Sequence, residues 1–183
     1  MNIEDFKKAL EIIKANESII IHRHSNPDGD ALGSQVGLLH IIKENYPEKS
    51  VYIVGDESER YGFIPNRIMD TVDDSLFPSS LSIILDTSSP SLISDDRWKN
   101  AKESLRFDHH LFIEKITDYE VVDSTYESCC GLIADFARTL SLKVSDNAAK
   151  ALYTGLVTDS GRFLYDSVSS RTHTIAAFLL ERS

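Results

Sequence analysis

Cysteine and long apolar segments are scarce in this sequence. The only two cysteines are the neighbours Cys129 and Cys130, so we expect no disulfide framework, a reducing compartment, and thiols that act as small buried hydrophobes. The longest apolar runs, such as Ser18–Ile21 and Leu81–Leu85, are far too short to cross a bilayer. Charged residues at positions 5, 7 and 8 interrupt any signal-peptide core. We therefore expect a cytoplasmic protein without a membrane partner.

Basic residues are also in short supply. Lysine and arginine total 19 against 29 acidic residues, which gives a formal net charge of −10. A chain this acidic is a poor candidate for gripping long nucleic acid through its phosphates. Clustered carboxylates could instead hold cations. With 183 residues, 42% hydrophobic and 26% charged, the composition suits one globular domain spanning residues 1–183.

Short apolar runs rich in β-branched residues alternate with segments of helical periodicity. We predict strands over 18–22, 50–54, 81–86, 102–107 and 119–123, and helices from a cap at Asn2 to about Asn16, over 30–45, around 132–140, over 145–158, and from 170 to the chain end. Residues 55–80 follow no clear pattern. Gly33 and Gly37 lie one turn apart and are expected to allow close packing on the sheet. The alternation predicts an α/β fold with a largely parallel sheet and helices on both faces.

Three predicted strands are each followed by metal-ligand residue types. His24, Asp28 and Asp30 follow the first, Asp86 follows the third, and Asp108, His109 and His110 follow the fourth. Ligands of open parallel sheets bind outside the carboxyl ends of the strands, so parallel pairing would bring these residues to one edge. Asp159, at the end of a predicted helix and before Gly161, could join them.

Carboxylates gathered in this way would repel one another. Each pair contributes about 4 kcal/mol at about 4 Å and an effective dielectric of about 20, and no cluster of lysine or arginine accompanies these motifs. Divalent cations would offset the repulsion. Mixed carboxylate and imidazole ligands suit Mn²⁺, with Mg²⁺, Co²⁺ or Zn²⁺ as substitutes. Six ligands suit two ions sharing a carboxylate, an arrangement typical of hydrolases in which a hydroxide attacks phosphorus in line with the leaving oxygen.

Each motif taken alone also has a simpler interpretation. Asn-Pro-Asp-Gly is an ordinary turn sequence, and Asp86 could be a helix cap or turn residue. Neighbouring histidines can pair with a buried acid, and Asp159 could make local hydrogen bonds. His22 is interpreted as structural, while Ser128 and Thr125 could contact phosphate or cap the following helix. The joint occurrence at successive strand ends favours the functional interpretation.

The motifs resemble the DHH phosphoesterase superfamily. His24-Ser-Asn-Pro-Asp28-Gly-Asp30, Ile-Ile-Leu-Asp86, Asp108-His109-His110 and Thr158-Asp159-Ser-Gly-Arg162-Phe163 match its four motifs in order. The first and last are most similar to the branch of oligoribonucleases and 3′-phosphoadenosine 5′-phosphate phosphatases. The resemblance implies a manganese-dependent phosphoesterase acting on a small nucleotide: a short oligoribonucleotide, phosphoadenosine phosphate or a cyclic dinucleotide.

The resemblance also implies a role for each residue. His24 and Asp28 would hold one Mn²⁺, Asp30, His109 and Asp159 would hold the other, and Asp86 would bridge both. His110 would contact the substrate phosphate, and Asp108 would orient a histidine. Arg162 is a candidate phosphate clamp, although a surface salt bridge would explain it equally well.

Members of the superfamily carry a C-terminal substrate-binding domain with a Gly-Gly-Gly-His motif, which this chain lacks. We expect that domain to be absent here, either because the chain is a fragment of a longer protein or because it acts alone, and we expect metal binding with poor turnover of nucleotides. An inorganic pyrophosphatase of family II and a non-catalytic metal-binding regulatory domain remain alternatives. A homodimer is left open.

Overall fold

The computed structural model describes residues 3–65 and 67–183. Asn2, the predicted cap of the first helix, lies outside the described residues. The first helix, α1 (Ile3–Ala15), packs the ring of Phe6 edge-on against Phe136, with 5.5 Å between the ring centroids. The N-terminal helix is therefore anchored in the main core.

In the described part of the chain, five strands form one sheet. They are β1 (Ser18–His22), β2 (Ser50–Ile53), β3 (Leu81–Leu85), β4 (Glu103–Asp108) and β5 (Tyr119–Val122), in the order β2-β1-β3-β4-β5. All four neighbouring pairs are parallel. The buried, β-branched runs thus form the parallel sheet predicted from them, and the carboxyl ends of the strands lie at one edge.

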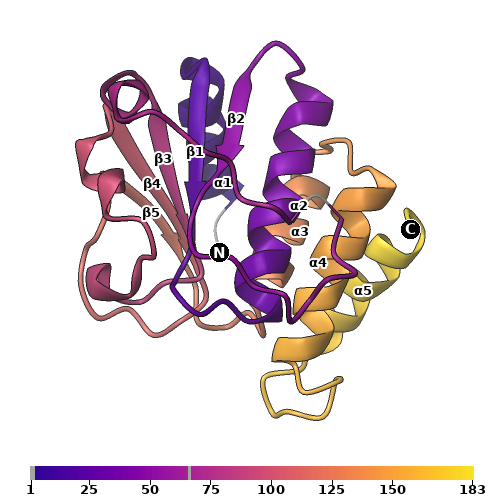
Figure 1. Ribbon diagram of the computed structural model, residues 1–183. Helices are drawn as coiled ribbons and strands as arrows, with labels where there is room; N and C mark the ends of the chain where they lie inside the picture. Colours follow the sequence, from indigo (N-terminus) through magenta and orange to yellow (C-terminus); the bar gives the residue numbers. More distant parts are fainter. Residues whose placement is uncertain (1–2, 66) are drawn as a thin grey trace.

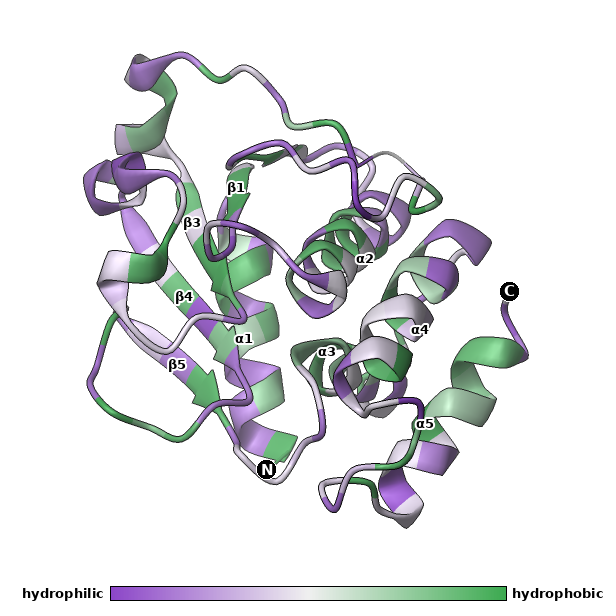
Figure 2. Ribbon diagram, turned by 60° about the horizontal axis from the view of Figure 1, so that its bottom comes forward, coloured by the Kyte–Doolittle hydropathy of each residue, from purple (hydrophilic) through white to green (hydrophobic). Residues whose placement is uncertain are grey.

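The α-helices lie on one side of the sheet. With α1, the helices α2 (Gly29–Asn45) and α3 (Cys129–Thr139) cover one sheet face, and α4 (Asp146–Asp159) and α5 (Ser170–Leu180) lie outside them (Figures 1 and 2). The side chains of Ile21, Ile83 and Phe107 point from the strands into this main core. Burial of this apolar interface is the main stabilising contribution to the fold.

Short 3-10 helices cover the opposite sheet face. They are η1 (Asp74–Ser79) and η3 (Asp96–Asn100), while η2 (Pro90–Leu92) follows β3. Phe77 of η1 forms a smaller core with Ile20, Val54 and Val72. Helices cover both faces, as predicted, but those of the second face are short 3-10 helices of six and five residues.

The glycines of α2 pack against another helix, which corrects the expectation that they would pack on the sheet. A Cβ atom at Gly33 would lie 2.5 Å from the carbonyl oxygen of Ala151, and one at Gly37 would lie 2.5 Å from the side chain of Leu152. Both partners belong to α4. The glycine stripe therefore lets α2 and α4 approach closely, which brings the end of α4 towards the start of α2.

None of the described helices is long and apolar enough to cross a membrane.

Candidate metal centre

The first group of site residues lies in the connection between β1 and α2. Asp28 is the N-cap of α2, and its Oδ1 accepts hydrogen bonds of 3.0 Å from the backbone N–H groups of Asp30 and Ala31. The Asn-Pro-Asp-Gly sequence is therefore a helix cap as well as a turn. Capping uses one carboxylate oxygen of Asp28 and leaves the other free to act as a ligand.

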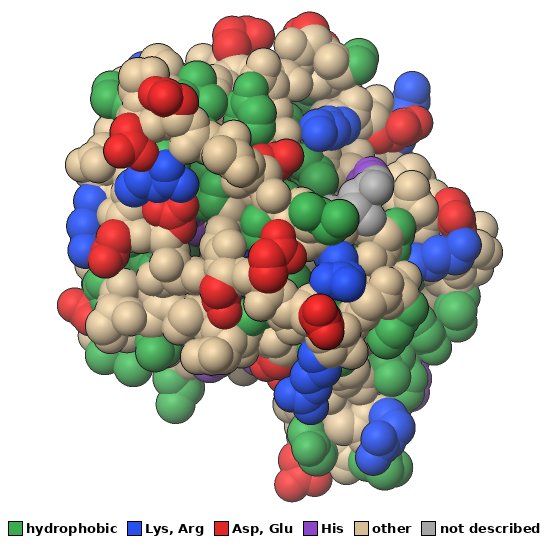
Figure 3. All heavy atoms as spheres, viewed as in Figure 1, with side chains coloured by type: hydrophobic (Ala, Val, Ile, Leu, Met, Phe, Trp, Pro, Cys, Tyr) green, Lys and Arg blue, Asp and Glu red, His purple; other side chains and the backbone are tan. Residues whose placement is uncertain are grey.

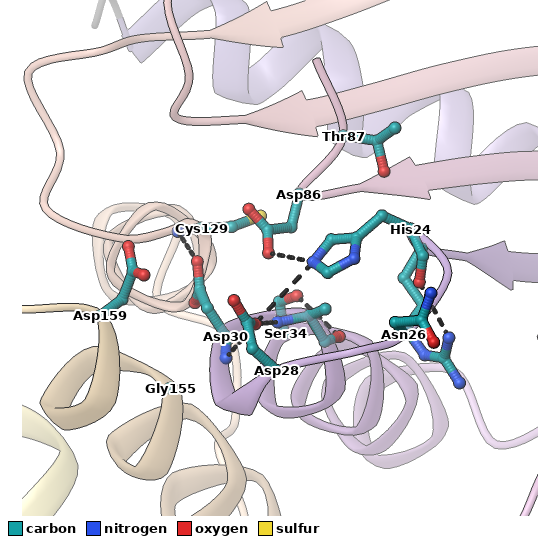
Figure 4. A network of polar contacts seen from close by, with 12 residues as sticks. His24, Asn26, Asp28, Asp30, Ser34, Asp86, Thr87, Cys129, Gly155 and Asp159 are labelled. Atoms are coloured by element: carbon teal, nitrogen blue, oxygen red, sulfur yellow. Dashed lines mark hydrogen bonds and ion pairs between the residues drawn. The ribbon is translucent and has the colours of Figure 1, made fainter. Parts of the chain in front are cut away.

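His24 faces the carboxylates with a defined ring nitrogen. Its Nδ1 lies 2.8 Å from the carbonyl oxygen of Ser25. Because a carbonyl oxygen only accepts, Nδ1 carries a proton in this contact, and Nε2 is the nitrogen left to act as a ligand. That Nε2 lies 3.5 Å from Asp86 Oδ2 and 3.9 Å from Asp28 Oδ1 (Figure 4).

Asp86 lies at the centre of the site. It follows β3 directly, has a positive φ of 51° and is 3% exposed. His24 approaches Asp86 from one side, while His109 Nε2 lies 3.5 Å from Asp86 Oδ1 on the other. A left-handed backbone at a non-glycine residue carries strain, and such residues cluster at functional sites. Asp86 therefore directs one carboxylate oxygen towards His24 and the other towards His109.

His109 joins the remaining acids to this group. Its Nε2 lies 3.7 Å from Asp30 Oδ2 and 3.4 Å from Asp159 Oδ2. The Nδ1 atom contacts the carbonyl oxygen of Tyr126 at 3.4 Å, which again leaves Nε2 unprotonated when the ring is neutral. Asp159 is the last residue of α4, so the glycine-mediated approach of α4 to α2 brings this acid into the site.

Asp30 is held by the N-terminus of α3. Its two carboxylate oxygens accept hydrogen bonds from the backbone N–H groups of Cys129, at 2.7 Å, and Cys130, at 2.8 Å (Figure 4). Ser128 caps the same helix by accepting a 2.9 Å hydrogen bond from the N–H of Gly131. The capping interpretation of Ser128 is therefore the one the structure supports. Sequence reasoning missed this anchor, because the donors are backbone groups that any residue type supplies.

Asp108 and His110 form a separate pair at the edge of the site. His110 Nδ1 lies 2.7 Å from Asp108 Oδ1, and this hydrogen bond raises the pKa of His110. Asp108 is buried, whereas the His110 side chain is 45% exposed. The buried carboxylate thus orients an accessible imidazole, and it is His110, rather than His109, that Asp108 contacts.

These side chains surround a cavity of about 280 Å³. Its lining comprises His24, Asp28, Asp86, Ser88, Leu92, His109, His110 and Asp159, while Asp30 lies beneath it, 1% exposed. Arg162 does not line this cavity. It lies exposed in a left-handed turn, in which Gly161, Arg162 and Phe163 have φ values of 58°, 58° and 66°. The predicted contact of Arg162 with phosphate stays a prediction.

Among the residues that the structure describes, three groups of side chains have the spacing of metal ligands. In each group the potential ligand atoms lie within 4.8 Å of one another: His24, Asp28 and Asp86; Asp30, His109 and Asp159; and Asp86, His109 and His110. Oxygen and nitrogen donors in this mixture suit a divalent transition metal. The first two groups contain all six predicted ligands.

The electrostatics of the site also fit cations. Burial and the neighbouring Asp86 raise the pKa of Asp30, and burial raises the pKa of Asp159 to about 6. Asp86 Oδ1 is buried and accepts no hydrogen bond from the residues that the structure describes, although the imidazole of His109 lies 3.5 Å away. A buried acceptor without a hydrogen bond is costly, and a cation between these oxygens would supply a direct interaction.

The histidines partly balance the acids when no ion is bound. A hydrogen bond to Asp86 raises the pKa of His24 to about 9. Burial opposes protonation of His109, yet Asp86, Asp30 and Asp159 outweigh it and raise its pKa to about 10. The site therefore stabilises positive charge at its centre.

Comparison with known proteins gives consistent results. The N-terminal domain of the DHH family matches residues 18–156. The chain is 42% identical over 176 residues to a Streptococcus mutans protein named probable bifunctional oligoribonuclease and PAP phosphatase NrnA, covering 96% of this chain and 56% of that protein. It is 32% identical over 175 residues to a Bacillus subtilis protein named bifunctional oligoribonuclease and PAP phosphatase NrnA, covering 94% and 55%.

Solved structures show the same fold. A Bacteroides fragilis protein described as exopolyphosphatase-related superimposes with a TM-score of 0.86 at 22% identity, covering 99% of this chain and 57% of the other. The chain thus spans about half the length of the curated relatives it matches. Because the family's N-terminal domain matches residues 18–156, most of this chain, the chain belongs to the DHH family.

Proposed function

We propose that this chain is the catalytic domain of a two-metal phosphoesterase that hydrolyses small nucleotides. The observation that carries the proposal is the convergence of six ligand side chains, from four separate segments, on one cavity. One ion would be held by His24 and Asp28, the other by Asp30, His109 and Asp159. Asp86 would bridge both, since its two oxygens face the two groups.

The chemistry follows from these ligands and their neighbours. When bound, two divalent ions supply Lewis acidity for an in-line displacement at phosphorus. His110 is accessible beside the cavity, and its bond to Asp108 leaves Nε2 available to a substrate phosphate oxygen. Asp108 fixes the orientation of this imidazole and favours its charged form. Mn²⁺ is the ion we propose, because imidazole and carboxylate donors occur together.

Short oligoribonucleotides and phosphoadenosine phosphate are the proposed substrates. The relatives that are 32–42% identical carry names for both activities, whereas a Methanococcus jannaschii protein described as a putative family II inorganic pyrophosphatase shares the fold at 19% identity, with a TM-score of 0.66. Acidic and basic side chains are interspersed on the face drawn in Figure 3, without a continuous basic track for long nucleic acid. We place the protein in the cytoplasm and leave a homodimer open.

The decisive experiment measures bound metal and hydrolysis in the same samples. Metal content would be determined after exposure to Mn²⁺, and product release would be followed with a diribonucleotide, phosphoadenosine phosphate and pyrophosphate. We expect two ions per chain and slow release from the nucleotides only. In Asp86→Ala both metal content and hydrolysis should fall, while Glu44→Ala, an exposed acid on α2, should match the wild type. Unchanged metal binding in Asp86→Ala would contradict the bridging assignment.

A further inference from the structure

Arg23 is a fully buried charged residue directly before His24. Its guanidinium is 0% exposed. The Nη1 atom donates hydrogen bonds to Asp56 Oδ1, at 2.8 Å, and to the carbonyl oxygen of His24, at 2.9 Å, and Nη2 donates to the backbone carbonyl of Asp56. The Nε atom donates to Gln35 Oε1 at 3.2 Å. Arginine is rarely buried unless its charge is paired, so the burial of Arg23 depends on its ion pair with Asp56.

Asp56 connects this arginine to the loop that carries His24 and Asp28. Its Oδ2 accepts a 2.8 Å hydrogen bond from the backbone N–H of Asn26, midway between the two proposed ligands. Asn26 has a positive φ of 51°, a conformation that needs support from its surroundings. Asp56 therefore holds the residue at which the ligand loop turns.

Ser94 completes the arrangement. Its hydroxyl donates to Asp56 Oδ1 at 2.6 Å and accepts from the backbone N–H of Asp56 at 2.8 Å. The N–H of Ser94 donates to the carbonyl oxygen of Arg23 at 3.0 Å. Burial alone would raise the pKa of Asp56, but the bonds from Ser94, Arg23 and Asn26 lower it to about 2. Asp56 is therefore a carboxylate at neutral pH.

Stability alone is a weak explanation for this ion pair. Arg23 is buried, whereas the Asp56 side chain is 39% exposed. Replacing a charge pair that is withdrawn from water by apolar residues is often neutral or stabilising, because the loss of hydration opposes the attraction between the charges. The contacts of this pair converge instead on one short segment, residues 24–26, through the carbonyl of His24 and the N–H of Asn26. Groups that fix the orientation of ligands commonly change metal affinity by about 10–100-fold when they are mutated.

We propose that Asp56, paired with Arg23, is a positioning residue for the metal ion held by His24 and Asp28. This inference rests on the proposed two-ion site. Asp56 is not itself a ligand: it acts through the backbone of Asn26 and through Arg23, and it fixes the ligand loop before an ion binds. Its influence is directed at one ion, since the anchors of the other are the N-terminus of α3 and the carbonyl of Tyr126.

The test is a calorimetric titration with Mn²⁺ alone on the full chain. The first variant is Asp56→Asn. The second is Ser94→Ala, a smaller change that removes one hydrogen bond to Asp56. His24→Ala is the reference for loss of the ion assigned to His24 and Asp28. The control is Asp95→Asn. Asp95 is also a partly buried acid paired with arginine, at 2.7 Å from Arg97 Nη2, but its carboxylate bonds to Arg97 and not to residues 24–28.

We expect Asp56→Asn to weaken one of two Mn²⁺ sites by about tenfold or more, the same site that His24→Ala abolishes, and to leave the other within about threefold. Ser94→Ala should show a smaller loss at that site, and Asp95→Asn should retain both affinities. If Asp56→Asn and Ser94→Ala lower only the melting temperature, or weaken both sites equally, Asp56 is structural and the inference is wrong. A wild-type chain that binds no Mn²⁺ would instead overturn the proposed function.

Discussion

At the scale of single residues, the site combines acids and imidazoles whose protonation states depend on one another. Burial alone would raise the pKa of Asp86, but the histidines on either side lower it. The same contact with Asp86 raises the pKa of His24 to about 9. Without an ion, protons on the histidines therefore provide part of the positive charge that metal ions would supply.

This coupling predicts that Mn²⁺ binding releases protons and strengthens as the pH rises. His24 and His109, with pKa values raised to about 9 and about 10, are protonated at neutral pH in the metal-free protein. A ligand imidazole must be neutral, so the apparent affinity should increase between pH 6 and pH 9. Titration calorimetry at one pH in two buffers with different ionisation enthalpies would measure the released protons. Identical heats in both buffers would contradict this prediction.

The two cysteines are predicted to be unreactive in the native protein. Cys129 and Cys130 are fully buried, and burial raises the pKa of each thiol well above its ordinary value. The thiolate is the reactive form, so a thiol reagent at neutral pH should label neither side chain until the chain is unfolded in denaturant. Mass spectrometry of native and denatured samples would check this, and rapid labelling of the native protein would be inconsistent with the structure.

At the scale of elements, the site depends on how closely three helices approach one another. The N-terminus of α3 binds Asp30 on α2, and Gly155 of α4 lies against both. A Cβ atom at Gly155 would lie 2.2 Å from Cys130 Sγ and 2.9 Å from Asp30 Cα. The contact with backbone cannot be relieved by a rotamer change, so a methyl group here must displace α4 or α2.

Gly155→Ala is therefore predicted to damage stability and metal binding together. We expect a loss of about 1–3 kcal/mol in the free energy of unfolding, the usual range for overpacking, and weaker binding of the ion assigned to Asp30, His109 and Asp159. Gly62→Ala is the matched control, since the nearest atoms to a Cβ there lie 3.6 Å away. Urea denaturation and Mn²⁺ titration of both variants would measure the effects. Equal stability of the two variants would argue against tight α2–α4 packing.

At the scale of the whole molecule, the site joins segments that are distant in the chain. Residues 24–30, 86, 109 and 159 meet at one edge, so an ion bound there links β1, α2, β3, β4 and α4. Because the unfolded chain cannot present these ligands together, binding adds to the free energy of unfolding of the entire fold.

Mn²⁺ is accordingly predicted to raise the melting temperature. At a free concentration about 100 times the dissociation constant, one ion contributes about 2.7 kcal/mol. A chelator should reverse the shift, and Asp86→Ala should reduce it. Differential scanning calorimetry with Mn²⁺, with Mn²⁺ and chelator, and with neither would measure these changes. A melting temperature indifferent to Mn²⁺ would contradict specific binding to the native state.

Much of this arrangement could be predicted from the sequence. Each predicted strand and helix is present, because buried parallel strands are continuous apolar runs and the helices carry their caps and periodicity in local sequence. The candidate ligands could be chosen because acids and imidazoles follow the apolar strands directly. Because parallel strands end at the same edge of the sheet, these ligands were expected to meet. The structure brings all six candidate ligands together. Their roles as ligands stay a prediction.

Other features depend on tertiary structure alone. The hydrogen bonds from α3 to Asp30 join residues 99 and 100 positions apart, and the contact between Asp56 and the N–H of Asn26 spans 30 positions. Nearly every residue type has a backbone N–H group, so the sequence does not reveal which of these groups will act as donors. Asp56 stands alone in an irregular segment and resembles any surface acid in the sequence. The sequence by itself thus determined the elements, their order and the chemistry at the strand ends, since these follow from local patterns of polarity. Only the packed chain decided what holds the ligands in place, because that depends on which distant surfaces come into contact.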